Sequence, residues 1–328
     1  MGDKKIGICL AGFGNFGKHI YSYLQKLNRW HVKYLYHPDQ KKAQFYGPLG
    51  LSDLSAVCND PDIEAFIIAT PNDQHFGLLR RLLQLGRHHI FVEKPMVDDF
   101  SQALVLRELA VANKKVFMVG HNQRREAGFR RIKALLDDNV IGKLVNVNFN
   151  FSHGGAYNTK PGDWRFSAAR HKDGPLITLG SHCIDTIHYL FGRIESVYAM
   201  IENLSDKTEA PDCNAVLARL ANGAAVFLQA NYNVPSEKYC IISGTDGVIY
   251  LNRDSLFLRI GRDWAKTPSK PMLMEIAFVD AIEEELNEFF YAIIEGKPVE
   301  TGFSEGFEVV KVLSTCHQSW LKKLPVPV

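Results

Sequence analysis

Short apolar runs and segments of helical spacing alternate along the first third of the chain. The apolar runs, which are typical of buried strands, lie at residues 5–10, 31–37, 64–70, 88–95 and 115–124. Apolar side chains at helical spacing fill the gaps, most clearly at residues 18–27, 75–86 and 101–115. Strands that alternate with helices of this length predict a parallel sheet with right-handed crossovers, which is a doubly wound α/β domain.

The pattern changes near residue 122. Helices are expected at 130–142 and 173–192, and a strand with alternating polarity at 145–153. Strand-like runs joined by short turns then follow at 196–203, 213–221, 224–233, 238–244, 247–252 and 255–261, and two helices close the chain at 278–296 and 304–323. This order predicts a second α/β domain with an open, mostly antiparallel sheet. We therefore divide the chain into residues 1–121 and 122–328.

Composition excludes several classes of protein. The 328 residues carry a formal net charge of +2 and no long basic cluster, so neither nucleic acid nor an anionic membrane is expected as a partner. No apolar segment is long enough to span a membrane, and the N-terminus lacks the pattern of a signal peptide. The six cysteines are scattered without metal-ligand spacing. We expect a cytoplasmic protein with reduced thiols, no metal and a small-molecule substrate.

A glycine-rich turn follows the first strand. The sequence Gly-Phe-Gly-Asn-Phe-Gly at residues 12–17 stands between a strand and a helix, the context in which such a motif binds a dinucleotide. The turn lets the backbone approach a pyrophosphate, and the helix start supplies N–H donors. The residues expected to bind the cofactor here are Gly12, Phe13, Gly14, Asn15, Phe16 and Gly17.

The end of the second strand bears on the choice between NAD and NADP. A carboxylate at this point would accept the 2′-hydroxyl of NAD and repel the 2′-phosphate of NADP. The chain has His37 there instead, with Lys41 and Lys42 beyond it. We expect His37 to contact the cofactor and favour NADP slightly. The alternative is that Asp39 reaches back and serves NAD.

Two further strand ends carry polar residues. Thr70, Asn72 and His75 follow the third strand, at the carboxyl edge where doubly wound sheets bind ligands. Glu93 and Lys94 end the fourth strand, and the proline after Lys94 holds that lysine in extended geometry. We expect these residues to line the cofactor site. As turn residues, or as a surface lysine at a strand end, they would need no function.

A polar stripe marks the helix expected at 173–192. Thr178, His182, Asp185 and Tyr189 are spaced by four, three and four residues, which places them on one helix face. Polar side chains on an apolar helix are costly unless they face a cavity or satisfied partners. The stripe therefore predicts a site, and a structural histidine is the alternative.

Several motifs together resemble the Gfo/Idh/MocA oxidoreductases, named for glucose-fructose oxidoreductase and inositol dehydrogenase. These are AGFGNFG, ATPNDQH, VEKP, GHNQRR, GDWR and GPLITLGSHCID, and the resemblance extends over nearly the whole chain. It implies a Rossmann domain, an open sheet used for dimers or tetramers, and NAD(P)-linked redox chemistry on a sugar, cyclitol or similar compound. It also implies that Lys94 hydrogen-bonds the reacting oxygen, that His182 is the acid/base, and that Asp185 holds substrate hydroxyls.

The sequence departs from the family pattern at one position and leaves others open. The family often has Asp or Asn four residues before the histidine, where this chain has Thr178, so the proton relay is in question. We expect Thr178 to line the substrate site with Arg124, Asp163, Trp164 and Arg165, although the last three could form a loop held by a buried tryptophan. A non-catalytic NAD(P) sensor or transcriptional co-regulator is the alternative function, and reduction of a linear tetrapyrrole is a third.

Overall fold

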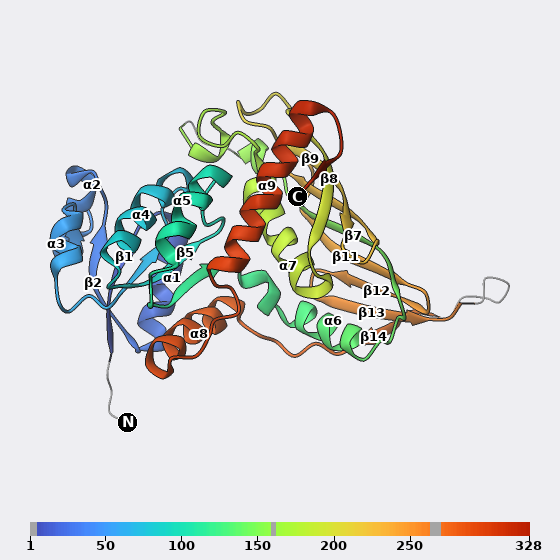
Figure 1. Ribbon diagram of the computed structural model, residues 1–328, viewed down its shortest axis with the longest axis horizontal. Helices are drawn as coiled ribbons and strands as arrows, with labels where there is room; N and C mark the ends of the chain where they lie inside the picture. The colour runs from blue at the N-terminus through green and yellow to red at the C-terminus, as the bar shows by residue number, and fades with distance from the viewer. Residues whose placement is uncertain (1–4, 159–161, 263–269) are drawn as a thin grey trace. The chain divides into compact units, whose positions relative to one another are not determined.

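The computed structural model of the protein describes residues 5–158, 162–262 and 270–328. The chain forms two compact units. The first unit ends at His121 but also takes in Ile282–Val310, and the second unit consists of Asn122–Ala281 and Lys311–Val328. Thus the C-terminal part of the chain contributes to both units (Figure 1). No helix among the described residues is long and apolar enough to cross a membrane.

The first unit is built on a six-stranded parallel sheet with the order β3-β2-β1-β4-β5-β6. Its strands are β1 (Ile6–Ala11), β2 (Trp30–Tyr36), β3 (Gly50–Leu51), β4 (Ala65–Ile68), β5 (His89–Glu93) and β6 (Phe117–Gly120). Its helices are α1 (Asn15–Leu27), α2 (Gln40–Gln44), α3 (Leu54–Asn59), α4 (His75–Leu85), α5 (Phe100–Ala110) and α8 (Ala281–Glu295), with the start of α9 (Phe303–Lys322). This confirms the doubly wound domain expected from the alternating pattern.

Two apolar layers cover this sheet because its strands are buried on both faces. On one face, Phe91 of β5 packs in a cluster with Leu286 and Phe289 of α8. On the other face, Val92 shares a cluster with Leu79 of α4 and Val310 of α9. Backbone pairing extends the unit further, since the amide of Val119 donates to the carbonyl of Thr301. These packed layers fix the carboxyl ends of the strands, where the candidate residues lie.

The second unit contains a nine-stranded sheet with the order β14-β13-β12-β11-β7-β10-β9-β8-β15. Its strands are β7 (Leu144–Ser152), β8 (Ile194–Glu202), β9 (Cys213–Leu220), β10 (Ala225–Asn231), β11 (Glu237–Gly244), β12 (Gly247–Asn252), β13 (Ser255–Ile260), β14 (Met272–Met274) and β15 (Val326–Pro327). All neighbouring pairs are antiparallel except β7 with β10. The mostly antiparallel sheet is thereby confirmed.

Helices α6 (Ala127–Asp137) and α7 (Ser181–Phe191) belong to this second unit, as Figure 1 shows. The helix expected at 173–192 is not uniform, because residues Leu176–Gly180 form a π-helical turn before α7 begins. In a π-helical turn the backbone hydrogen bonds join residues five apart rather than four, so the turn is wider than an α-helical one. The even spacing assumed for the polar stripe therefore holds from His182 onward but not across Thr178.

Candidate cofactor and substrate site

The three glycines of the turn after β1 play different structural parts. Gly12 has φ of 92°, and a Cβ there would lie 2.6 Å from the backbone of Ala69 and Thr70. A Cβ on Gly17 would lie 2.1 Å from the carbonyl oxygen of Gly12, so this glycine lets α1 pack closely against the turn. Around Gly14, by contrast, no described atom lies within 4 Å of a Cβ. The backbone is therefore open to a ligand at the middle glycine.

Helix α1 starts at this opening without a capping side chain. Gly14 is its N-cap and supplies no side-chain hydrogen bond, and the first turn has no acidic residue. The first N–H groups of a helix carry a partial positive charge and bind anions when no side chain caps them. Asn15 is exposed, while Phe13 and Phe16 are half-buried, and Phe13 packs edge-on against Tyr21. The geometry fits a pyrophosphate over Gly14.

After β2, the first carboxylate, that of Asp39, caps a helix. Asp39 is the N-cap of α2, and its Oδ1 accepts from the amides of Lys41 and Lys42 at 2.9 and 3.3 Å. The amide of Asp39 in turn donates to Nδ1 of His37 at 3.0 Å. Burial lowers the pKa of His37 below its ordinary value. A fixed neutral imidazole and two exposed lysines therefore occupy the position expected to meet the adenosine ribose.

Polar atoms without hydrogen-bond partners lie after β4. Thr70 and Asn72 are 9% and 6% exposed, yet the described residues offer no partner to Oγ1 of Thr70 or Nδ2 of Asn72. Unpaired buried polar groups are rare in native proteins, and a bound ligand or water can satisfy them. His75 is fully buried, with its ring nitrogens 3.0 Å from the carbonyl of Pro95 and 3.1 Å from that of Thr70. It thus ties the loop after β4 to the loop after β5.

The end of β5 brings a buried carboxyl group next to a lysine. Glu93 is 7% exposed, and burial raises its pKa to about 7, an effect that the charge of Lys94 partly offsets. Its partner in the ladder is Gly120 of β6, where a Cβ would lie only 2.8 Å from Oε1 of Glu93. Lys94 follows as a half-buried residue. Since β4 and β5 are paired in register, these residues and Thr70 lie at the same sheet edge.

The first unit therefore has the features that a nicotinamide dinucleotide needs. The pyrophosphate would lie over Gly14 and the start of α1, and Thr70, Asn72 and Glu93 would contact the remainder with atoms that the protein leaves unsatisfied. No group of three or more His, Cys, Asp or Glu side chains suited to a metal occurs in the described part of the chain.

In the second unit, α7 carries His182 in its first turn. The imidazole is half-buried, and its ring centroid lies 6.1 Å from that of Phe151 at the end of β7. Asp185 is nearly fully buried one helical turn further on. His188, which lies off the polar stripe, has its pKa lowered to about 4 by burial, in keeping with a structural role.

Two residues expected to bind substrate, Arg124 and Asp185, form a buried ion pair with each other. The guanidinium of Arg124 donates from Nε to Oδ2 of Asp185 at 2.9 Å and from its terminal nitrogen to Oδ1 at 2.5 Å. Gln123 donates to the hydroxyl of Thr186 at 2.9 Å, and Arg130 donates to that of Tyr189 at 2.8 Å. The segment that follows β6 is thus hydrogen-bonded along α7, and both partners of the ion pair are at most 6% exposed.

The expected wall residues form an aromatic and charged loop. Arg165 stacks on the ring of Trp164 at 4.9 Å and contacts Asp163 at 3.4 Å. Trp164 also meets the ring of His171 edge-on at 5.3 Å. Trp164 and Arg165 are both partly exposed, so the loop presents an aromatic ring and a guanidinium together at its surface. Such a surface suits a polyhydroxylated ring.

The hydroxyl of Thr178 is engaged by a residue that sequence analysis did not identify. Oγ1 of Thr178 and the phenol of Tyr232 are hydrogen-bonded, and both residues are buried. Tyr232 also contacts His153, with ring centroids 4.9 Å apart. Thr178 and Tyr232 are 54 residues apart in the sequence, and no local motif around Tyr232 predicts this hydrogen bond.

Comparison with known proteins identifies the family. Residues 5–121 match the oxidoreductase family with an NAD-binding Rossmann fold, and residues 129–250 match the GFO/IDH/MocA C-terminal domain. The chain therefore belongs to the Gfo/Idh/MocA oxidoreductase family, as its motifs indicate.

Three relatives illustrate the range of the family. The chain is 30% identical over 212 residues to the uncharacterized oxidoreductase YhhX of Escherichia coli, covering 62% of this chain and 59% of YhhX. It is 25% identical over 322 residues to levoglucosan dehydrogenase of Pseudarthrobacter phenanthrenivorans, covering 82% of each protein. With scyllo-inositol 2-dehydrogenase (NADP(+)) IolW of Bacillus subtilis it shares 29% over 175 residues, covering 53% and 48%.

The solved structures agree on the fold. Levoglucosan dehydrogenase in complex with NADH and levoglucosan matches with a TM-score of 0.88 and 24% identity, covering 99% of this chain and 100% of that one. At this identity the likeness establishes the common architecture and no more.

Proposed function

We propose that the protein is an NAD(P)-dependent oxidoreductase that transfers a hydride between nicotinamide and a CH–OH or keto group of a sugar, cyclitol or related compound. The observation that carries the proposal is the combination of open space at Gly14 with buried, unsatisfied polar atoms at Thr70 and Asn72 on the same sheet edge. Relatives named for levoglucosan and scyllo-inositol support the substrate class.

The chemistry divides between cofactor and protein. A nicotinamide accepts or donates the hydride, so the protein must handle a proton and align the substrate. We assign the proton to His182, and we assign polarisation of the reacting oxygen to Lys94, whose ammonium favours a developing alkoxide. The half-buried state of each side chain supports the assignment, because Lys94 directly follows β5 and His182 lies in the first turn of α7, and both remain partly exposed.

Trp164 and Arg165 are the proposed contacts to the substrate ring. The stacked pair presents an apolar face and hydrogen-bond donors at once.

Arg124 and Asp185 have a different role in this proposal. Because the two groups form a buried bidentate pair, we assign them to holding α7 in place, with any contact to substrate hydroxyls made from that fixed position.

For the cofactor we propose a preference for NADP. Capping of α2 engages Oδ1 of Asp39, and Lys41 and Lys42 are exposed beside it. Basic side chains at this position accommodate a 2′-phosphate. The relative IolW is named for NADP(+), which agrees with this preference.

We further propose that the protein assembles into a homodimer or homotetramer through the second sheet. Strand register aligns one row of mainly apolar side chains across eight strands: Tyr198, Leu217, Phe227, Asn148, Ile241, Tyr250, Phe257 and Leu273. Leu217, Phe227 and Leu273 are 47%, 45% and 68% exposed. Large exposed apolar surfaces mark interaction sites.

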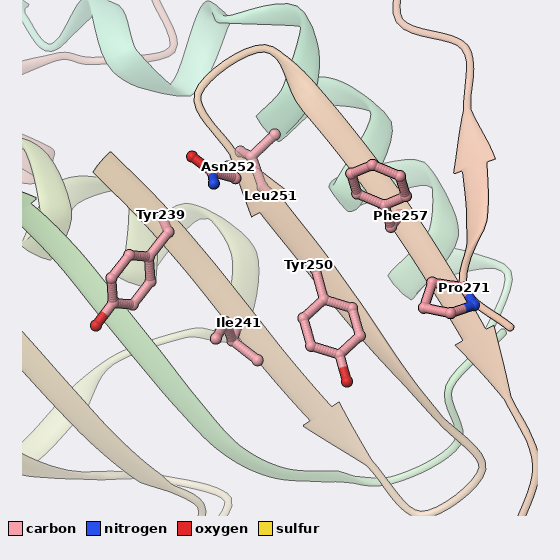
Figure 2. Close-up of a pocket in the computed structure, with 7 residues that line it drawn as sticks. All are labelled: Tyr239, Ile241, Tyr250, Leu251, Asn252, Phe257 and Pro271. Carbon is pink, nitrogen blue, oxygen red and sulfur yellow. The ribbon is translucent and has the colours of Figure 1, made fainter. Parts of the chain in front are cut away.

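A groove of about 540 Å³ lies along this row. Figure 2 shows Tyr239, Tyr250 and Phe257 on its adjacent strands, with Pro271 at one side. Its apolar lining suits side chains of a second copy. A Phe227→Asp variant that sediments as a monomer, beside an assembled wild type, would support the interface, and a monomeric wild type would refute it.

The experiment for the activity is nicotinamide absorbance with purified protein, offering NAD⁺ and NADP⁺ in parallel against inositols, free sugars, anhydrosugars and sugar phosphates. We expect turnover with NADP⁺ that falls at least about 100-fold in both Lys94→Ala and His182→Ala. Cofactor titration by fluorescence accompanies each variant. Variants with near wild-type turnover would refute the two assignments, and a wild type that binds cofactor but turns over nothing would favour the sensor function.

A further inference from the structure

The π-helical turn Leu176–Gly180 is an unusual element in an important place. It leads directly into α7, whose second residue is His182. Single π-helical turns within α-helices are rare and are frequently found at functional sites. The turn is tightly confined, since a Cβ on Gly180 would lie 2.7 Å from Cδ1 of Leu176. The orientation of the imidazole therefore depends on what holds this turn.

Two buried side chains from the sheet hold it. Oδ1 of Asn214, on β9, accepts from the amide of Leu176 at 2.9 Å. The phenol of Tyr232, just after β10, is hydrogen-bonded to Thr178 in the middle of the turn. Asn214 and Tyr232 are 1% and 2% exposed. The turn is thus attached at its first residue to β9 and at its third residue to the residue that follows β10.

Both attachments are themselves anchored. The amide of Asn214 donates to Oδ1 of Asn231 at 3.1 Å, and Nδ2 of Asn231 donates to Oγ of Ser152 at 3.0 Å. A chain of hydrogen bonds therefore runs from β7 through β10 and β9 to the turn. Buried hydrogen bonds of this kind restrict side-chain positions, although Nδ2 of Asn214 has no partner among the described residues.

Tyr232 is anchored on the opposite side. Its amide donates to the carbonyl of Asp212 at 2.8 Å, its carbonyl accepts from Ala156 at 2.9 Å, and its ring lies 5.5 Å from that of Phe166. Burial raises the pKa of the phenol to about 12, so it keeps its proton at neutral pH. Tyr232 consequently connects the loop that carries the substrate wall to the turn before His182.

We propose that Tyr232 and Asn214 are positioning residues, which hold the π-helical turn through Thr178 and Leu176 and so orient His182 for proton transfer. This inference rests on the proposed function, because it gives the imidazole a defined part. It also assigns a role to Thr178, because the hydroxyl of Thr178 forms the hydrogen bond that attaches the turn to Tyr232. A uniform α-helix at 176–180 would shift Thr178 relative to His182 and lose this attachment.

The test compares Tyr232→Phe, Thr178→Val, their double variant and the conservative Thr178→Ser. We expect kcat/KM to fall about 10- to 100-fold in Tyr232→Phe and Thr178→Val, because misplacing a catalytic group costs rates of this order. The double variant should be no worse than either single variant, because both substitutions remove the same hydrogen bond. Thr178→Ser should rescue most of the activity. Tyr291→Phe, a partly exposed tyrosine on α8, is the matched control and should match the wild type.

A second readout does not depend on turnover. The imidazole of His182, assigned by its loss in His182→Gln, is followed by NMR across pH in each variant, and NADPH affinity is titrated in parallel. We expect its resonances and titration midpoint to change in Tyr232→Phe and Thr178→Val but not in Tyr291→Phe, with NADPH affinity unchanged. An unaltered His182 signal, or losses that add in the double variant, would overturn the inference even if no substrate were found.

Discussion

The cofactor side of the first unit and the histidine-bearing side of the second unit are built in different ways. In the first, Gly12, Gly14 and Gly17 act within six residues, and each does its work through backbone geometry. In the second, the important contacts join residues far apart in sequence: Arg124 with Asp185 and Thr178 with Tyr232 are 61 and 54 residues apart. One region is specified locally and the other by packing.

This difference decides how each region should respond to substitution. A local turn can be damaged at one position and left intact at the next, because each glycine meets different surroundings. A region made of long-range pairs should lose stability and function together, because the same contacts serve both. The largest, intermediate and smallest expected effects test this contrast in turn.

The largest effect is expected for Asp185→Ala in the second unit. Removing one partner of a buried ion pair costs about 3 to 5 kcal/mol of unfolding free energy, because the remaining charge loses its counter-charge. Urea unfolding of wild type and variant measures the loss. Asp137→Ala, which removes the exposed partner of Lys133 on α6, is the matched control and should change stability by less than about 0.5 kcal/mol. Equal effects of the two substitutions would mean that the Arg124 pair is not structurally important.

An intermediate effect is expected in the glycine turn. Gly12→Ala should destabilise the protein by about 2 to 4 kcal/mol, because it combines a φ of 92° with a Cβ placed 2.6 Å from backbone atoms. Gly14→Ala should leave the melting temperature nearly unchanged, since its Cβ meets open space, but weaken dinucleotide binding about tenfold or more. Calorimetry and fluorescence titration separate the two outcomes. Normal NADPH affinity in Gly14→Ala would place the pyrophosphate elsewhere.

The same contrast explains what the sequence could predict. The sheet of the first unit and its glycine turn follow from periodicity and a short motif, and the strands of the second sheet follow from alternation. The capping role of Asp39 was also within reach, because an aspartate before a short polar helix is a common N-cap. The π-helical turn could not be predicted, since Thr178 and His182 have the spacing of an α-helix in the sequence. Tyr232 and the partners of Arg124 become visible only once distant strands are packed together.

The smallest of these effects is expected for Glu93, and it depends on pH. Its carboxyl group has an ordinary pKa of 4.5 and a folded-state pKa of about 7, so the folded protein binds this proton more tightly than the unfolded chain does. The contribution of this group to stability must then fall as pH rises from 4.5 to 7, by about 3 kcal/mol in total. Glu93→Gln removes the titration, so the variant should gain stability over wild type at pH 8 but not at pH 4.5. Chemical unfolding at both values measures the difference between them. A variant that lost stability equally at both pH values would contradict this prediction. It would mean that Glu93 is ionised at both values and that the charge of Lys94 has a larger effect on its carboxyl group than burial has.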